Sequence, residues 1–180
     1  MSDITVRLLG DEDWQTYRDV RLAALKESPE AFSASAAEEQ QYDEELWRRR
    51  MQRSTRLVAQ DGDDVVGVVS VGGFEAEDAD DRVAELFGLW VNPDLRGKGV
   101  AWKLVQAGAE QAKADDYGHL VYWVATDNGR AVAFASSFGF RPTDARRTMK
   151  HASPNAPDDE EMAMVYPLGD DPGAVPNSLQ

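Results

Sequence analysis

Hydrophobic and polar residues alternate along several short segments of the chain, and along others they repeat every three to four residues. Alternation is typical of half-buried strands, and the longer repeat is typical of helices with one buried face. In residues 11–25, for example, Trp14, Tyr17, Val20 and Ala24 are spaced as one helix face. Strands are predicted at residues 4–9, 55–74 (a hairpin turning at Asp61-Gly62), 82–91, 118–125, 144–151 and 160–168, and helices at residues 11–25, 43–53, 101–116 and 128–139.

The predicted order is therefore β-α-α-β-β-β-α-β-α-β-β, with no internal repeat. Residues 27–41 are predicted to form a loop or a broken helix, because Pro29 ends the preceding pattern. We expect a single domain at residues 1–168. Residues 169–180 are rich in Gly, Pro and polar residues and are predicted to be a flexible C-terminal tail.

Three local features refine this prediction. Asp43 precedes the second helix and is a plausible N-cap. Gly88 interrupts the strand at 82–91, where we expect a bulge or a close approach. The helix at 101–116 is predicted to carry Leu104, Ala107, Gln111 and Ala114 along one side.

Composition narrows the class of protein. A hydrophobic content of 42% with five Trp is typical of a globular chain, and the absence of Cys excludes disulfides and thiolate chemistry. No apolar run approaches the ~18 residues that cross a membrane. The first ten residues lack the layout of a secretory signal, so we expect a cytoplasmic protein. No metal site is predicted.

The formal net charge is −14. Such a surface repels nucleic acids and anionic lipid, so we expect neither as a partner. It attracts cationic small molecules or basic peptides, although the acidity alternatively serves only to keep the chain soluble.

The stretch "NPDLRGKGVAW", residues 92–102, joins a predicted strand to a predicted helix. It does not fit the phosphate loop of nucleotide hydrolases, because Gly99 is followed by Val100 in place of Lys. It does not fit the dinucleotide fingerprint either, because Trp102 stands where the third Gly belongs.

A third pattern, Q/R-x-x-G-x-G/A, is satisfied by Arg96, Gly99 and Ala101. Glycines leave backbone N–H groups unshielded, and a helix that begins at the turn directs its unpaired N–H groups and positive dipole end outward. Lys98 and Lys103 add positive charge. The turn is therefore predicted to hold a diphosphate, with a connection that binds nothing as the alternative.

"LWVNPDLRGKGVAWKLV" followed by "NGRAVAFASSFGF" resembles the acetyl-CoA signature of the GNAT superfamily of N-acetyltransferases, over roughly residues 3–167. The resemblance implies an α/β fold whose mixed, mainly antiparallel central sheet is splayed at its centre and flanked by about four helices. It also implies acetyl-CoA as co-substrate and an amine as acceptor.

The same resemblance implies roles for individual residues. Backbone groups of Leu89, Trp90 and Val91 would contact pantetheine. Asn128 and Phe134 would contact the pantetheine arm, and Arg130 would meet the adenosine-side phosphate. A helix cap is the alternative for Asn128. Backbone amides would hold the pyrophosphate at Arg96, Gly97, Lys98, Gly99, Val100, Ala101 and Trp102.

Acetyl transfer requires a neutral amine, and an alkylamine is mostly protonated at pH 7, so a base must remove the proton. Glu85 lies eleven residues before Arg96. Several family members carry their catalytic glutamate at the matching position. The alternative is an ordinary strand glutamate that meets solvent or an Arg.

The chain departs from the family pattern at Ala135, where a Tyr often acts as general acid. Water, Ser136 or Tyr122 would then protonate the leaving thiolate. The predicted function is an N-acetyltransferase that acts by direct attack of the amine, and the alternative is a non-catalytic acyl-CoA-binding module.

The acceptor is not identified by the sequence: small cationic amines and peptide or protein amines both remain open. A negatively charged mouth for a cationic amine is one hypothesis, formed by Glu27, Glu30, Glu38, Glu39 and residues 158–161. Homodimerisation through the C-terminal strands also remains open.

Overall fold

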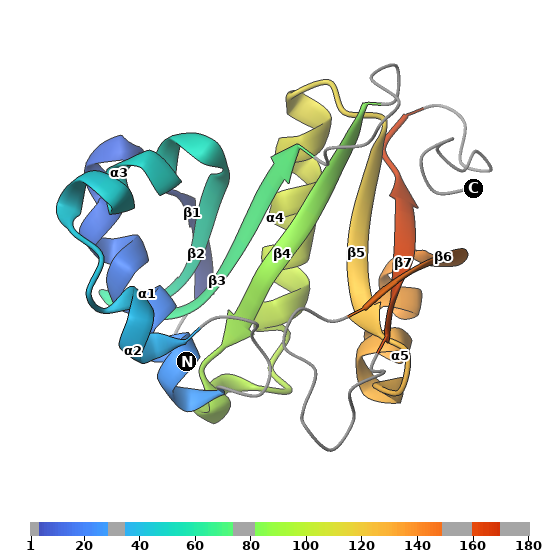
Figure 1. Cartoon of the computed structure of the whole chain (residues 1–180). Coiled ribbons are helices and arrows are strands. Elements are labelled where there is room, and N and C mark those ends of the chain that lie inside the picture. Colours follow the sequence, from blue (N-terminus) through green and yellow to red (C-terminus); the bar gives the residue numbers. More distant parts are fainter. Residues whose placement is uncertain (1–3, 29–34, 74–81, 149–159, 170–180) are drawn as a thin grey trace. The chain divides into compact units, whose positions relative to one another are not determined.

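The computed structural model describes residues 4–28, 35–73, 82–148 and 160–169. The strands, drawn as arrows in Figure 1, are β1 (Ile4–Leu8), β2 (Thr55–Asp61), β3 (Asp64–Gly73), β4 (Val83–Val91), β5 (His119–Ala125), β6 (Arg141–Thr148) and β7 (Glu160–Pro167). The α-helices are α1 (Trp14–Glu27), α2 (Ala36–Glu39), α3 (Glu44–Arg53), α4 (Val100–Ala114) and α5 (Gly129–Phe138), and two 3-10 turns are η1 (Asp11–Asp13) and η3 (Pro93–Leu95).

The strands form a seven-stranded sheet with the hydrogen-bonding order β1-β2-β3-β4-β5-β7-β6. β4 and β5 run parallel, from the pair Val83–His119 to the pair Leu86–Tyr122. The pairs β1–β2, β2–β3, β5–β7 and β6–β7 are antiparallel. The predicted α/β fold with a mixed, mainly antiparallel sheet is confirmed.

The chain divides into two compact units. Unit 1 comprises Met1–Gly72 and Gly88–Gly108, and unit 2 comprises Gly73–Phe87 and Ala109–Gln180.

Unit 1 has an aromatic core. The predicted face of α1 is buried, and the Tyr17 ring meets the edge of the Trp47 ring of α3 with 5.9 Å between ring centroids. Full burial of a large apolar side chain contributes about 1.5–3 kcal/mol. Around these rings lie Leu9, Trp14, Val20, Ala24, Met51, Val58, Val68 and Trp90.

Unit 2 packs α5 beside β5 and β7 through aromatic rings. Phe138 and Phe140 both contact the Tyr166 ring, with centroid distances of 5.2 and 5.5 Å, and Tyr122 lies 6.0 Å from Phe140. Gly139 ends α5 with φ 125°, at the position where the sequence predicts the end of this helix.

Several boundaries differ from the predictions. The described residues contain five α-helices, one more than the approximate four expected, because Ser35 caps the short helix α2. β6 begins at Arg141, before the predicted residue 144, and includes Pro142. It is the last strand in the sheet order, and an edge strand tolerates proline. Residues 170–180 of the predicted tail lie outside the described residues.

The Asp43 cap is confirmed, since its Oδ1 accepts a hydrogen bond from the Leu46 N–H at 2.9 Å. Within the described part of the chain, no helix is long and apolar enough to span a membrane.

Candidate functional site

The turn between β4 and α4 in unit 1 is an open loop with a defined backbone. Asn92 begins it, and its Oδ1 accepts from the Asp94 N–H at 3.0 Å. Gly97 and Gly99 have φ angles of 80° and 81°, in the left-handed region that side chains disfavour. A Cβ added at either would meet no heavy atom within 4 Å among the described residues. The two glycines therefore leave backbone exposed that a bulky anion can approach.

α4 starts directly at this turn. The Lys103 N–H donates to the Gly99 carbonyl at 3.1 Å, so the N–H groups of Val100, Ala101 and Trp102 precede the first α-helical bond. Val100 is buried and anchors the helix start, whereas Trp102 is 40% exposed. The positive end of the helix dipole thus lies at the predicted diphosphate position.

Two of the three predicted cations contact protein groups. The Arg96 guanidinium donates to the Val91 carbonyl at 3.0 Å and to the Glu27 carboxylate at 2.9 Å. The Lys103 ammonium donates to the Ile4 carbonyl at 3.2 Å. Lys98 is exposed on the turn itself.

The strand that leads into the turn is distorted at Gly88, whose φ is 65°. This agrees with the predicted interruption. Leu89 is half-buried, whereas Trp90 and Val91 are buried. The Trp90 indole donates to Glu27 at 2.8 Å.

Glu85 lies on the unit 2 portion of β4 and is ion-paired. Arg147 of β6 lies 3.6 Å from its carboxylate and also pairs with Glu161 of β7 at 3.0 Å. The Arg147 guanidinium covers the Trp123 ring at 4.4 Å. Glu85 is therefore not surrounded by apolar strand residues alone, and it meets an arginine, as one of the two interpretations of the sequence anticipated.

The second predicted motif begins α5. Asn128 caps this helix, since its Oδ1 accepts from the Ala131 N–H at 3.1 Å. Arg130 is exposed and Phe134 is half-buried. Ala135, at the position where relatives often carry Tyr, is 1% exposed and belongs to the packed interior.

Residues 19–140 match the Acetyltransferase (GNAT) family. The chain belongs to this family.

Solved structures of GNAT proteins have the same fold at low sequence identity. An N-acetyltransferase from Staphylococcus aureus Mu50 aligns with a TM-score of 0.72 and 21% identity, over 93% of this chain and 100% of that one. A protein from Salmonella typhimurium assigned as an acetyltransferase, whose structure holds its cofactor acetyl-CoA, aligns with a TM-score of 0.69 and 19% identity, over 96% and 99%. The ribosomal-protein-S18-alanine N-acetyltransferase of Escherichia coli aligns with a TM-score of 0.66 and 16% identity, over 96% and 99%.

One curated protein is similar in sequence. An uncharacterized N-acetyltransferase of Methanocaldococcus jannaschii is 34% identical over 59 residues. The match covers 33% of this chain and 26% of that relative, so the chain spans about a quarter of that protein's length.

Two candidate general acids stand in this GNAT chain in place of the missing Tyr. Burial raises the pKa of the Tyr122 phenol, and the neighbouring Glu161 charge raises it further, so the phenol keeps its proton at neutral pH. Ser136 is exposed on α5.

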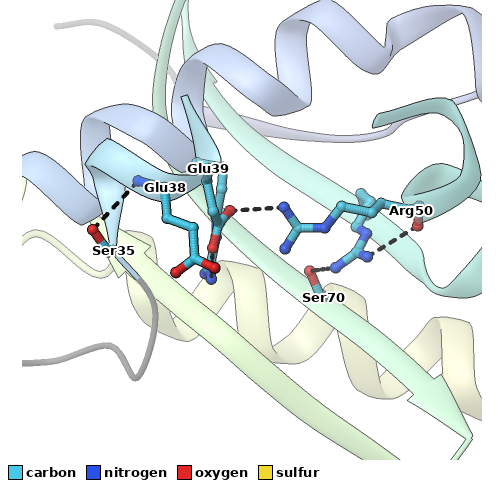
Figure 2. Close-up of polar contacts among 7 residues, drawn as sticks. Ser35, Glu38, Glu39, Arg50 and Ser70 are labelled. Carbon is cyan, nitrogen blue, oxygen red and sulfur yellow. Dashed lines mark hydrogen bonds and ion pairs between the residues drawn. The ribbon is translucent and has the colours of Figure 1, made fainter. Parts of the chain in front are cut away.

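A buried ionic cluster in unit 1 was not predicted from the sequence. Glu39 accepts from Arg21 at 3.2 and 3.1 Å, and only 3% of its surface is exposed. It also accepts from Arg50 at 2.7 Å (Figure 2). Next to it, Arg56 donates to the Ser70 hydroxyl at 2.7 Å, and burial lowers the pKa of Arg56 to about 10. Glu39 therefore presents no carboxylate to solvent and contributes none to the hypothesised acidic mouth.

The remaining members of that mouth differ from one another. Glu38 is exposed at the start of α2, and Glu27 and Glu161 are ion-paired with arginines. Glu30, Asp158 and Asp159 lie outside the described residues, and Glu160 is exposed. No sequence motif other than their charge identified Glu27 and Arg147, so their contacts could not be predicted from the sequence.

Proposed function

We propose that this GNAT protein is an N-acetyltransferase that moves the acetyl group of acetyl-CoA to an amine by direct attack. The observation that supports this most strongly is the turn at residues 96–102. There, two exposed glycines with positive φ precede the backbone N–H groups of the first turn of α4, whose first α-helical bond begins only at the Lys103 N–H. A Cβ at either glycine would occupy the space that a diphosphate needs, so the glycines fit the predicted ligand.

In this proposal acetyl-CoA is bound by backbone and side-chain groups together. The backbone amides of residues 96–102 hold the pyrophosphate, and the backbone at 89–91 pairs with pantetheine. Asn128 and Phe134 contact the pantetheine arm, and Arg130 meets a phosphate. Capping of α5 by Asn128 is compatible with this role, because the cap uses Oδ1 and leaves the Nδ2 amide as a donor.

Glu85 is the proposed base. It accepts a proton from the ammonium form of the acceptor, directly or through water, and the amine lone pair then attacks the thioester carbonyl. The C–N bond forms, the C–S bond breaks, and the nitrogen gives its second proton to solvent water. A backbone N–H of the distorted strand at Leu89 or its neighbour would stabilise the oxyanion.

The leaving thiolate takes a proton from Tyr122, Ser136 or water. A thiol has a pKa near 8.5, so its thiolate leaves without an obligatory acid. The buried Ala135 therefore does not argue against turnover. The acceptor class is left to experiment, with small cationic amines and peptide or protein amines as the candidates.

The test is CoA release from acetyl-CoA against a panel of amines, read with a thiol reagent. The chain contains no Cys, so the protein adds no background signal. Release that depends on one class of amine would support the proposal and identify the acceptor class. Binding of acetyl-CoA without release across the panel would instead support the non-catalytic acyl-CoA-binding module.

A further inference from the structure

The last residue of α1, Glu27, collects three hydrogen-bond donors on one carboxylate oxygen. Its Oε2 accepts from the Trp90 indole of β4 at 2.8 Å and from the Arg96 guanidinium of the turn at 2.9 Å. The Ser28 hydroxyl also donates to it. These donors come from the residue that follows α1, from β4 and from the turn, all within unit 1.

The position of Glu27 is unfavourable for a carboxylate in isolation. It ends a helix, where the macrodipole is negative and favours cations. The three donors offset this unfavourable interaction between the carboxylate and the helix dipole. The Ser28 hydroxyl and then the Trp90 indole lower the pKa of Glu27, and the Arg96 charge adds to the effect. Glu27 is therefore ionised at neutral pH and remains a strong acceptor for Arg96.

The Arg96 side chain is held by three acceptors as a result. Its Nε donates to the Val91 carbonyl at 3.0 Å, while Nη2 donates to Glu27 at 2.9 Å and to the Ser28 hydroxyl at 3.4 Å. The first bond spans the segment between residues 91 and 96, including η3, and the second fixes that segment to the end of α1. Charge-assisted bonds of this kind are stronger than neutral ones, so they restrict the turn that Arg96 begins.

We infer that Glu27 is a positioning residue for the turn at residues 96–102, and that it acts through Arg96. It does not touch the co-substrate. It orders the turn before acetyl-CoA arrives, so that less conformational freedom is lost on binding. This inference rests on the proposed function, since it assumes that the turn binds the pyrophosphate of acetyl-CoA.

The first variant is Glu27→Gln, which keeps the size of the side chain and removes its charge. Acetyl-CoA is titrated calorimetrically in the absence of amine. We expect the Kd to rise on the order of tenfold, because small displacements of a positioned group cost up to about a hundredfold. With acetyl-CoA saturating, kcat should stay within about twofold of wild type. Glu45→Gln, an exposed residue of α3, makes the same change in net charge and should leave the Kd unchanged.

A double-mutant cycle separates positioning from general loss of stability. Glu27→Gln is combined with Arg96→Gln, and the Kd of all four proteins is measured. If Glu27 acts through Arg96, Glu27→Gln adds less than about twofold to the Kd in the Arg96→Gln background. Trp90→Phe, which removes the indole donor together with part of a buried ring, provides a second variant if Glu27→Gln does not fold, and its Kd should rise by a smaller factor.

The outcomes are distinguishable. Suppose that the wild-type protein binds acetyl-CoA and turns it over. A Kd for Glu27→Gln equal to that of the wild type would then overturn the inference and leave the proposed function intact. Independent effects of Glu27→Gln and Arg96→Gln on the Kd would do the same. If Glu27→Gln does not fold, an unchanged Kd for Trp90→Phe would overturn the inference. Absence of acetyl-CoA binding by the wild-type protein would overturn the proposed function and the inference together.

Discussion

Arg21 holds Glu39 through two parallel hydrogen bonds, from Nε to Oε1 at 3.2 Å and from Nη2 to Oε2 at 3.1 Å. This fork geometry is the strongest arrangement open to an arginine and a carboxylate. It connects α1 to the one-turn helix α2, and Arg50 of α3 completes the contact from the other side at 2.7 Å. Three helices of unit 1 are therefore joined at one buried carboxylate.

Glu39→Gln should lower the free energy of unfolding by about 3 kcal/mol, because removing one partner of a buried pair leaves charges uncompensated. Urea denaturation measures this. Glu38→Gln is the matched control on the same helix, where the side chain is exposed and a change within about 0.5 kcal/mol is expected. Equal losses in the two variants would mean that the cluster contributes nothing specific.

The same glutamate should make stability depend on acid pH. Burial alone would raise the pKa of Glu39, but the bonds from Arg21 and Arg50 outweigh burial and hold it below its ordinary value of 4.5. A lowered pKa in the folded state contributes stability above pH 4.5 that is lost as pH falls through the folded value. Unfolding free energies measured from pH 7 down to pH 3 should therefore fall less steeply in Glu39→Gln than in the wild type.

The order of helices and strands was predictable because most of these elements have a clear periodic pattern of apolar residues. The face of α1 and the β2–β3 hairpin are examples. The buried side of α4 does not coincide with the side identified from the sequence: there Leu104 is buried, Gln111 is half-buried and Ala114 is exposed, whereas Val105 and Ala112 are buried as well. In a helix rich in alanine, small side chains give a weak hydrophobic signal, so the direction of the buried face is poorly defined.

In the candidate site, too, some features were predictable from the sequence and others were not. The turn was predictable because glycine spacing and helix position fix a backbone geometry, and Gly97 and Gly99 have the positive φ angles expected of such a turn. The ion pairs of Glu27 and Glu39 were not predicted, and for Glu85 an arginine partner was anticipated only as an alternative, without identifying Arg147. Each joins residues far apart in sequence, and no local pattern reports such a partner.

Gly99→Ala tests the turn without removing any side chain. A non-glycine residue at φ 81° costs about 1–2 kcal/mol of stability. Gly62 of the β2–β3 turn has φ 63° and equal open space, so Gly62→Ala should cost a similar amount. We expect only Gly99→Ala to raise the Kd for acetyl-CoA. The rise should be on the order of tenfold, because a contact with the anion is lost. Equal Kd values in the two variants would place the pyrophosphate elsewhere.

Ala135→Tyr tests whether the usual family acid can be restored. Because Ala135 is 1% exposed, a phenol there should overpack the interior and cost about 1–3 kcal/mol, without an increase in kcat. Ala133→Tyr, at an exposed position on the same helix, should change stability by less than about 0.5 kcal/mol. Thermal unfolding and the CoA-release assay measure the two effects. A stable Ala135→Tyr enzyme with raised kcat would instead mean that this position faces the reacting thiolate.

Glu85→Gln tests the proposed base against its ordinary structural role. Loss of a general base lowers kcat by about 10²- to 10⁴-fold, and the Kd for acetyl-CoA should not change. Glu161 is the informative comparison because it shares Arg147 with Glu85 and is similarly half-buried. If the ion pair mattered only for folding, Glu85→Gln and Glu161→Gln would lower stability and activity together and by similar factors. A loss of kcat confined to Glu85→Gln, with unfolding free energies matched between the two variants, separates the catalytic role from the structural one.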